Sequence, residues 1–307
     1  MKKKTSIRLI VTDIDNTIFD WVSYYSYSMV ALFEKVETII NVPKAKLAEE
    51  ARDIFTRHSS IEYPFVVQDM ASVIAFYGSD IDKMLTEAVE PGRKAFLKRA
   101  ENLLVPYPDV EETLKTIKKK YPDLPMVALT DAPRYIAMWK LNKLKVLSYF
   151  SAVYGLPDPR IPTDPDLGRV KVSPHILLKH LQQYDFGFKG KIRILPEEYE
   201  KPGTRGLKTV LMDYDLDESA EKSGQVLWIG DNLRKDIGLG QRVGVKSAWA
   251  SYGTNLDPEV MKILHTFSPT DNIHKNVSLP SNSPTTPTPD IVLKQFSDIL
   301  AFIEQSI

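Results

Sequence analysis

Residues 7–17 read Ile-Arg-Leu-Ile-Val-Thr-Asp-Ile-Asp-Asn-Thr, an apolar run that ends in acidic and turn-forming residues. A short run of apolar and β-branched residues bounded by polar ones is typical of a buried strand. Side chains two positions apart on an extended chain point the same way, so Asp13 and Asp15 place two carboxylates side by side where the strand ends. Such a pair can supply a nucleophile and a general acid and base, although Asp and Asn are also common in turns.

Similar runs recur along the chain and predict a parallel sheet. Strands are expected at 7–12, 126–130, 152–155 and 225–230, with weaker candidates at 246–250 and 290–293. Helical patterns lie between them, at 110–121, 133–147, 236–243 and 293–303. This alternation is typical of an open α/β sheet, in which ligands bind beyond the carboxyl ends of the strands.

Two segments interrupt the alternation and are expected to be inserts. Residues 21–104 show helical patterns alone, at 28–40, 44–57, 65–76 and 81–103. Residues 156–200 are rich in Pro and Asp, then carry a helical piece at 174–183 and a further strand candidate at 191–195, which is longer than an ordinary connection. We therefore expect a core formed by residues 1–20 and 105–307, a helical cap at 21–104, and a small second insert at 156–200.

The composition limits the classes of partner. The 307 residues hold 40 Lys and Arg against 40 Asp and Glu, so bulk charge does not favour nucleic acid or an anionic membrane. There is no cysteine, which excludes disulfides and thiolate nucleophiles. The apolar run after the basic first residues is too short for a signal-peptide core, and no stretch reaches the roughly 18 apolar residues of a membrane span. We expect a cytoplasmic protein with neither nucleic-acid nor membrane partners.

The second predicted strand ends in Thr130 and Asp131, followed by Ala132 and Pro133. In one interpretation Thr130 or Asp131 is simply the N-cap of the next helix, with Pro133 in its first turn. In the other, the same helix start binds an anion through free backbone N–H groups, and the Thr130 hydroxyl adds a donor. The two interpretations are compatible.

A later strand ends in Gly230 and Asp231, with Asp236 at the start of the following helix. A carboxylate at a strand end is a natural ligand for a hard cation, and Asp236 could orient that cation or bind it through water. The alternative for Asp236 is an N-cap.

A lysine is also expected to contribute. Lys201, held by Pro202 before a helix at 204–211, could present its ammonium to a phosphate and to an attacking carboxylate. Lys171, followed by Val-Ser-Pro, is the competing candidate.

Taken together and in this order, the four motifs resemble those of the haloacid dehalogenase superfamily of phosphohydrolases. Its motifs are Asp-x-Asp-x-Thr, a Ser or Thr that ends a strand, a Lys often followed by Pro, and Gly-Asp-x-x-x-x-Asp. They are matched here by Asp13, Asp15 and Thr17, by Thr130, by Lys201, and by Gly230, Asp231 and Asp236. The resemblance covers residues 7–20, 106–155 and 199–255, and it says little about the helical insert.

The resemblance implies a three-layer, Rossmann-like core and a magnesium-dependent phosphatase that acts on a small phosphate monoester. In that family's mechanism, the counterpart of Asp13 becomes phosphorylated, and the counterpart of Asp15 protonates the leaving oxygen and then activates water. Mg²⁺ would be held by Asp13, the backbone carbonyl of Asp15 and Asp231, with Asp236 in support.

The same resemblance implies the phosphate contacts, whereas a polar loop between helices of the insert supplies the candidates for contact with the rest of the substrate. Thr130, Asp131 and Lys201 would bind the phosphate, and Arg57, His58 and Tyr63 are candidates for contact with the rest of the substrate. The second acid, Asp15, favours a phosphatase over a dehalogenase. A phosphomutase of the superfamily and a non-catalytic regulatory protein that keeps the fold are the alternatives.

Overall fold

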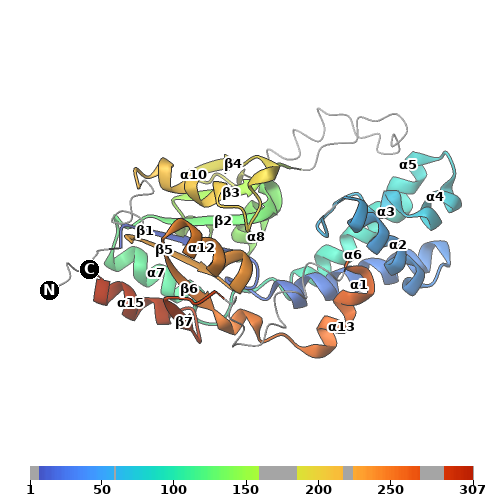
Figure 1. Cartoon of the computed structure of the whole chain (residues 1–307). Helices are drawn as coiled ribbons and strands as arrows, with labels where there is room; N and C mark the ends of the chain where they lie inside the picture. Colours follow the sequence, from blue (N-terminus) through green and yellow to red (C-terminus); the bar gives the residue numbers. More distant parts are fainter. Residues whose placement is uncertain (1–6, 59, 159–184, 217–223, 270–286, 307) are drawn as a thin grey trace.

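The computed structural model describes residues 7–58, 60–158, 185–216, 224–269 and 287–306. Its centre is one seven-stranded parallel sheet in the order β4-β3-β2-β1-β5-β6-β7 (Figure 1). The strands are β1 (Leu9–Thr12), β2 (Met126–Pro133), β3 (Ala152–Leu156), β4 (Lys191–Ile194), β5 (Val226–Gly230), β6 (Lys246–Ala250) and β7 (Ile291–Leu293). The predicted α/β fold is confirmed, including the strands with the weakest sequence signal.

The middle of the sheet contains the point at which the strand order changes direction. The strand β1 pairs with β2 on one side and with β5 on the other, and Thr12 is in register with both Ala128 and Ile229. The chain builds outward from β1 to β4 and then returns to the opposite side of β1 to add β5, β6 and β7. In open parallel sheets, ligands bind beyond the carboxyl ends of the strands at such a switch point.

Both faces of the sheet are covered by helices, as the fully buried strands β1 and β5 require. Leu9 and Val11 pack with residues of α10 (Arg205–Asp213) and α12 (Gly238–Val243). Ile10, on the opposite face, belongs to the cluster that includes α7 (Val110–Lys120), α8 (Arg134–Lys143) and α15 (Asp298–Ser306). The result is a three-layer core, with α10 and α12 on one side of the sheet and α7 and α15 on the other (Figure 1).

The chain from residue 21 to residue 104 contains helices and no strand in its described part, and it lies to one side of the sheet (Figure 1). Its helices are α1 (Trp21–Ile40), α2 (Lys44–Arg57), α3 (Val66–Asp69), α4 (Ala71–Tyr77), α5 (Ile81–Met84) and α6 (Glu90–Ala100). Asp20 caps α1 by accepting a hydrogen bond from the backbone N–H of Ser23. A π-helical turn, Leu85–Val89, joins α5 to α6, next to Pro91, which has no N–H to donate.

One helix from the end of the chain joins this helical unit. The helix α13 (Pro258–Phe267) follows β6 in sequence but packs against α1 and α2. The ring of Phe267 meets that of Phe33 edge-on at 5.5 Å, and Arg52 of α2 donates to the carbonyl of Thr266 at 2.9 Å. The predicted boundaries place α13 with the core, whereas in the structure it packs as a second segment of the helical unit.

The other predicted insert contains part of the sheet. The strand β4 pairs with β3 and forms the sheet edge, so this portion of 156–200 belongs to the core layer. Lys171 and the helix predicted at 174–183 lie outside the described residues. Among the residues that are described, no helix combines the length and apolar character needed to cross a membrane.

Candidate active site

The carboxyl ends of β1 and β5 bring three aspartates together. Asp13 follows β1 directly, and its backbone N–H donates to the carbonyl of Ile229 in β5 at 2.8 Å. Asp231 follows β5, and Asp236 lies in the next turn, the π-helical segment η5 (Leu233–Ile237). Carboxylate oxygens of Asp13, Asp231 and Asp236 all lie within 4.8 Å of one another. The three aspartates, which come from two distant segments of the sequence, thus form one cluster in space.

Lys201 lies inside this cluster. Its ammonium nitrogen is 2.8 Å from Oδ2 of Asp13 and 2.9 Å from Oδ1 of Asp236, and its side chain is only 5 % exposed. The indole ring of Trp228, in β5, lies 5.3 Å from the same nitrogen. Of the two lysines considered from the sequence, Lys201 lies beside Asp13, whereas Lys171 lies outside the described residues.

Asp236 is held rigidly. Its side chain is 1 % exposed, and Oδ2 accepts a hydrogen bond from the backbone N–H of Asn232 at 3.0 Å. A Cβ atom at Gly230 would come within 2.4 Å of the Asp236 side chain, so this close approach requires glycine. The N-cap of the segment is Asn232, whose side chain accepts from two backbone N–H groups. The alternative that Asp236 is the N-cap is therefore wrong.

The second predicted motif does not cap the next helix, contrary to one of the two sequence interpretations. The strand β2 continues to Pro133, which becomes the N-cap residue of α8 without a side-chain capping bond. Thr130 is buried, and its Oγ1 accepts from the backbone N–H of Ala132 at 3.1 Å. Neither Thr130 nor Asp131 caps the helix, because α8 begins only at Arg134 and its N-cap residue is Pro133.

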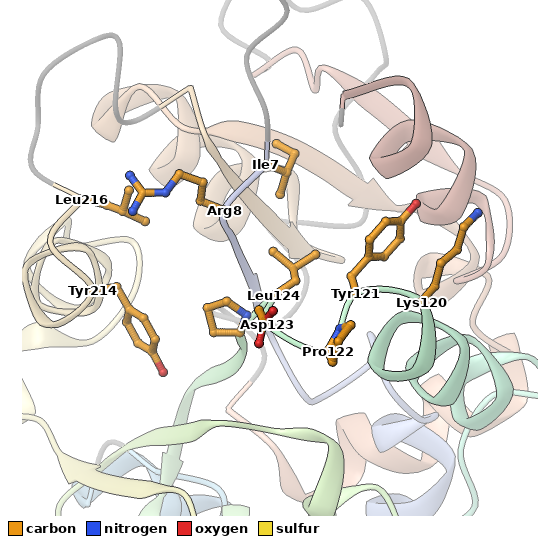
Figure 2. Close-up of a pocket in the computed structure, with 10 residues that line it drawn as sticks. Ile7, Arg8, Lys120, Tyr121, Pro122, Asp123, Leu124, Tyr214 and Leu216 are labelled. Atoms are coloured by element: carbon orange, nitrogen blue, oxygen red, sulfur yellow. The ribbon is translucent and has the colours of Figure 1, made fainter.

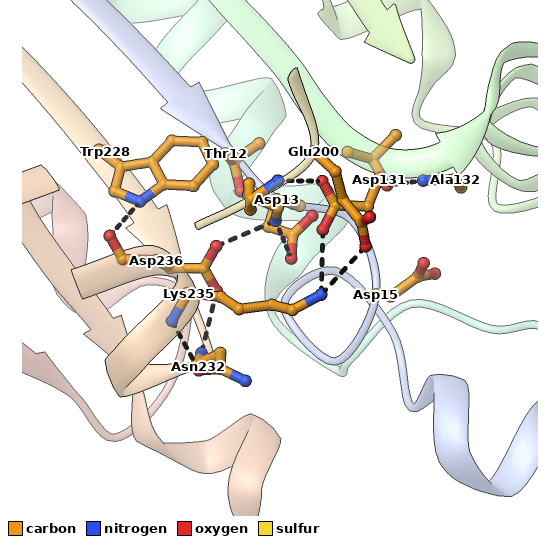
Figure 3. A network of polar contacts seen from close by, with 12 residues as sticks. Thr12, Asp13, Asp15, Asp131, Ala132, Glu200, Trp228, Asn232, Lys235 and Asp236 are labelled. Carbon is orange, nitrogen blue, oxygen red and sulfur yellow. Dashed lines mark hydrogen bonds and ion pairs between the residues drawn. The ribbon is translucent and has the colours of Figure 1, made fainter. Parts of the chain in front are cut away.

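Each carboxylate oxygen of Asp131 contacts a different segment of the chain (Figure 3). Oδ1 accepts from the backbone N–H of Lys201 at 2.9 Å, and Oδ2 lies 3.3 Å from the ammonium of Lys235. Lys235 also lies 3.5 Å from Glu200. With its carboxylate committed to these partners, Asp131 could take part in the predicted phosphate contact through its backbone N–H.

Burial and crowding of like charges shift the pKa values of the acids. Burial raises the pKa of Asp13 to about 7, against the opposing effect of Lys201. Burial also raises the pKa of Asp231 well above its ordinary value, and the neighbouring carboxylates of Asp236 and Asp13 add to that shift. Burial disfavours the charged form of Lys201, but Asp13 and Asp236 raise its pKa well above the ordinary value. One ammonium among three carboxylates leaves an excess of negative charge.

Asp15 has partners that the sequence did not reveal. Lys140 of α8 is fully buried, and its ammonium lies 2.8 Å from Oδ1 of Asp15 and 2.6 Å from Oε1 of Glu62 in the insert. Burial raises the pKa of Asp15 to about 6, while Lys140 opposes this shift. The signal for Lys140 is a charged residue placed between Ala137 and Leu144 at helical spacing, where periodicity predicts an apolar side chain.

The residues predicted to contact the substrate lie in the insert, and His58 and Tyr63 contact other residues of the insert. His58 stacks on Tyr63 with ring centroids 3.8 Å apart, and the Tyr63 hydroxyl donates to Asp69 at 2.9 Å. Arg57 is exposed at the end of α2. The insert residue that reaches the core at Asp15 is Glu62, the neighbour of Tyr63. The role of Arg57, His58 and Tyr63 toward a substrate stays a prediction.

A pocket of about 530 Å³ lies at the opposite end of the strands (Figure 2). Its walls include Ile7 and Arg8, which precede β1, and Leu124 and Pro125, which precede β2. It therefore borders the amino ends of the strands, whereas Asp13 lies beyond their carboxyl ends. The pocket and the aspartate cluster are therefore separate.

Solved structures with the same fold have different chemistries. A 2-haloacid dehalogenase from Pseudomonas syringae pv. tomato is 15% identical, with 98% of this chain and 100% of that chain covered and a TM-score of 0.52. A haloacid dehalogenase-type phosphatase from Thermococcus onnurineus is 14% identical, with 97% and 98% covered and a TM-score of 0.52. At these identities the likeness shows the fold alone.

The comparison of sequences gives the family. No curated protein matches the chain. The family model described as haloacid dehalogenase-like hydrolase matches residues 7–244, a range that holds Asp13, Thr130, Lys201 and Asp231. The chain therefore belongs to the haloacid dehalogenase-like hydrolases.

Proposed function

We propose that this hydrolase is a magnesium-dependent phosphatase that acts on a small phosphate monoester through an aspartyl-phosphate on Asp13. The observation that carries the proposal is a second carboxylate, Asp15, two residues after the buried nucleophile and held by Lys140 at 2.8 Å. Cleavage of a phosphate ester creates an alkoxide that benefits from a proton donor, whereas cleavage of a carbon–halogen bond does not. Asp15 has a purpose in the first reaction that it lacks in the second.

The donor set fits a hard divalent cation. Asp13, Asp231 and Asp236 bring carboxylate oxygens within 4.8 Å of one another, and oxygen ligands are what Mg²⁺ prefers. Asp13 and Asp231 would hold the ion, together with the backbone carbonyl of Asp15, and Asp236 would support it. When bound, such an ion lowers the repulsion between an anionic nucleophile and the phosphoryl group.

The chain's own residues supply the remaining chemistry. In the first step an oxygen of Asp13 bonds to phosphorus, the bond from phosphorus to the leaving oxygen breaks, and Asp15 gives that oxygen its proton. In the second step water attacks phosphorus, Asp15 takes a proton from that water, and the carboxylate of Asp13 is released. Lys201, beside Asp13, and Thr130 would bind the non-transferred oxygens of the phosphate.

The helical unit is proposed to act as a cap that excludes water and contacts the organic part of the substrate. It approaches the proposed acid directly, since Glu62 and Asp15 share the ammonium of Lys140. Arg57, His58 and Tyr63 remain the proposed substrate-contacting residues of this cap.

Hydrolysis of 4-nitrophenyl phosphate, with and without Mg²⁺, tests the proposal. The wild type should release phosphate only with the metal, and Asp13→Asn should abolish turnover without loss of fold. Acid-quenched wild type should carry one phosphoryl group on Asp13. Phosphate release that survives a chelator would overturn the metal assignment. Transfer of the phosphoryl group to a sugar phosphate in place of water would indicate a mutase, and halide release from 2-chloropropionate would indicate a dehalogenase.

A further inference from the structure

Lys140 is a buried cation whose carboxylate partners come from two different segments, the loop after β1 and the helical insert. It lies on α8 with no exposed surface, and its ammonium is 2.8 Å and 3.1 Å from the two carboxylate oxygens of Asp15. The third partner is Oε1 of Glu62, at 2.6 Å. We propose that Lys140 is a positioning residue for Asp15 and that Glu62 clamps Lys140 in place, an inference that rests on the proposed phosphatase function.

The contacts of Lys140 limit the role that it can have. An ammonium group has three N–H donors, and three carboxylate oxygens lie within 3.1 Å of this one. No donor is left for a substrate phosphate. The role of Lys140 therefore differs from the phosphate-binding role proposed for Lys201. Lys140 therefore acts through Asp15, and it keeps its own protons while Asp15 donates and accepts one.

Contact with both oxygens fixes the direction of the Asp15 carboxyl group. The Asp15 side chain is 25 % exposed, and without a partner it would be free to turn toward solvent. Lys140 cannot follow such a movement, because its stem is fully buried and the ring of Phe19 lies 5.9 Å from its nitrogen. A proton donor held in one orientation reacts without the entropic cost of being positioned during the reaction.

Glu62 connects this arrangement to the helical insert. Its side chain is 11 % exposed, and Oε1 also accepts a hydrogen bond from the indole N–H of Trp21 at 3.0 Å. Trp21 is the first residue of α1 and stacks on Tyr25 at 5.1 Å. The ammonium of Lys140 thus connects the core helix α8 to Glu62 in the insert. Glu62 in turn contacts Trp21 in the first helix of the insert. Docking of the insert sets the position of Lys140 and, through it, that of Asp15.

The charges argue against a purely structural ion pair. Two carboxylates surround one ammonium, so the group keeps an excess negative charge in a largely buried place. Burying charges is costly, and apolar residues of the same size often give equal stability. A cluster that served stability alone would not need the second acid, Glu62. A group that holds Lys140 in one position does need it.

Aryl phosphates with different leaving groups test the inference. Phenoxide is more basic than 4-nitrophenoxide and depends more on a proton from Asp15. We expect Lys140→Met to lose about 10- to 100-fold more kcat on phenyl phosphate than on 4-nitrophenyl phosphate, within the range of general acid catalysis. Lys143→Met, an exposed lysine on the same helix, should leave the ratio of the two rates at its wild-type value.

A second pair of variants guards against misfolding of Lys140→Met. Glu62→Gln should change the same ratio in the same direction by a smaller factor, whereas Glu49→Gln, on the exposed side of α2, should not. If Lys140→Met does not fold, Glu62→Gln decides alone. Equal losses on both esters, or none, would overturn the positioning role while the phosphatase stands. A wild type that hydrolyses neither ester would overturn the proposed function and this inference together.

Discussion

The ammonium nitrogen of Lys201 lies 2.8 Å from Oδ2 of Asp13, although one residue precedes α10 and the other follows β1. The side chains of both are at most 10 % exposed. The same nitrogen contacts Asp236 at 2.9 Å, so a single cation connects Asp13 to the last acid of the fourth motif. In the proposed mechanism, a lysine in this position would contact the phosphate that Asp13 attacks.

The first prediction is that Lys201→Ala loses most of its turnover, whereas Lys171→Ala stays near wild type. A preorganised electrostatic donor contributes on the order of 10² to 10³ in rate, which sets the expected loss of kcat. The measurement is kcat on 4-nitrophenyl phosphate at saturating Mg²⁺, with folded variants confirmed by circular dichroism. The reverse ranking would transfer the role to Lys171.

The second prediction concerns Asp131, which accepts a hydrogen bond from the backbone N–H of Lys201 at 2.9 Å. Asp131→Ala removes this acceptor and the partner of Lys235, so the loop that carries Lys201 is held less firmly. A charge-assisted hydrogen bond contributes about 1.5–3 kcal/mol, and we expect kcat to fall about tenfold or more.

Asp131→Asn is the matched control, because it keeps an oxygen for the N–H of Lys201 while removing the charge that Lys235 faces. It should retain more activity than Asp131→Ala. If the two variants lose kcat equally, the negative charge of Asp131 matters and the tether to Lys201 does not.

The sequence predicted most of the core and the residues that end its strands. Asp13, Asp15 and Asp231 could be located because each follows a continuous apolar run, and parallel strands end at one edge of the sheet. Their grouping depends only on local pattern and on the general topology of such sheets. That is why the weak strand at 290–293 could be recognised as well.

The missed features depend on contacts between distant segments. Glu62, Lys140 and Asp15 meet only because the insert docks beside α8, and no local periodicity records that packing. The packing of α13 on α1 and α2 is a tertiary contact of the same kind. The end of β2 was also placed too early, at 130, because pairing with β3 extends the strand to Pro133.

The third prediction concerns the cap. Replacing Arg57 or His58 by Ala should alter the relative rates among phosphorylated metabolites while sparing hydrolysis of a small phosphate ester. For Tyr63, the variant is Tyr63→Phe, which keeps the ring stacked on His58 and removes only the hydroxyl that contacts Asp69. The measurement is kcat/KM across a substrate panel, and an unchanged ranking for all three variants would show that other residues select the substrate.

The last prediction concerns Asp213, at the end of α10, the helix that follows Lys201. Its carboxylate accepts from the Tyr154 hydroxyl at 2.6 Å and lies 2.9 Å from Lys191 and 3.2 Å from Arg193. Burial raises the pKa of Asp213, but the hydrogen bonds and the two cations outweigh it, so the pKa falls below the ordinary 3.8. These contacts attach α10 to β3 and β4.

A lowered pKa means that the folded protein favours the carboxylate, so this stabilisation is complete above pH 3.8 and is lost as the pH falls through the folded-state value. Both cations are more than 40 % exposed, so screening by solvent limits the effect, and Asp213→Asn should lower the free energy of unfolding by about 1 kcal/mol at pH 7. Urea unfolding at pH 7 and at pH 3 measures it, with the exposed Asp53→Asn as control. The gap between wild type and Asp213→Asn should shrink at pH 3, since the wild type then gains a proton that the amide cannot take. A gap that persists or widens at pH 3 would mean that the shape of the side chain, rather than its charge, attaches α10 to the sheet.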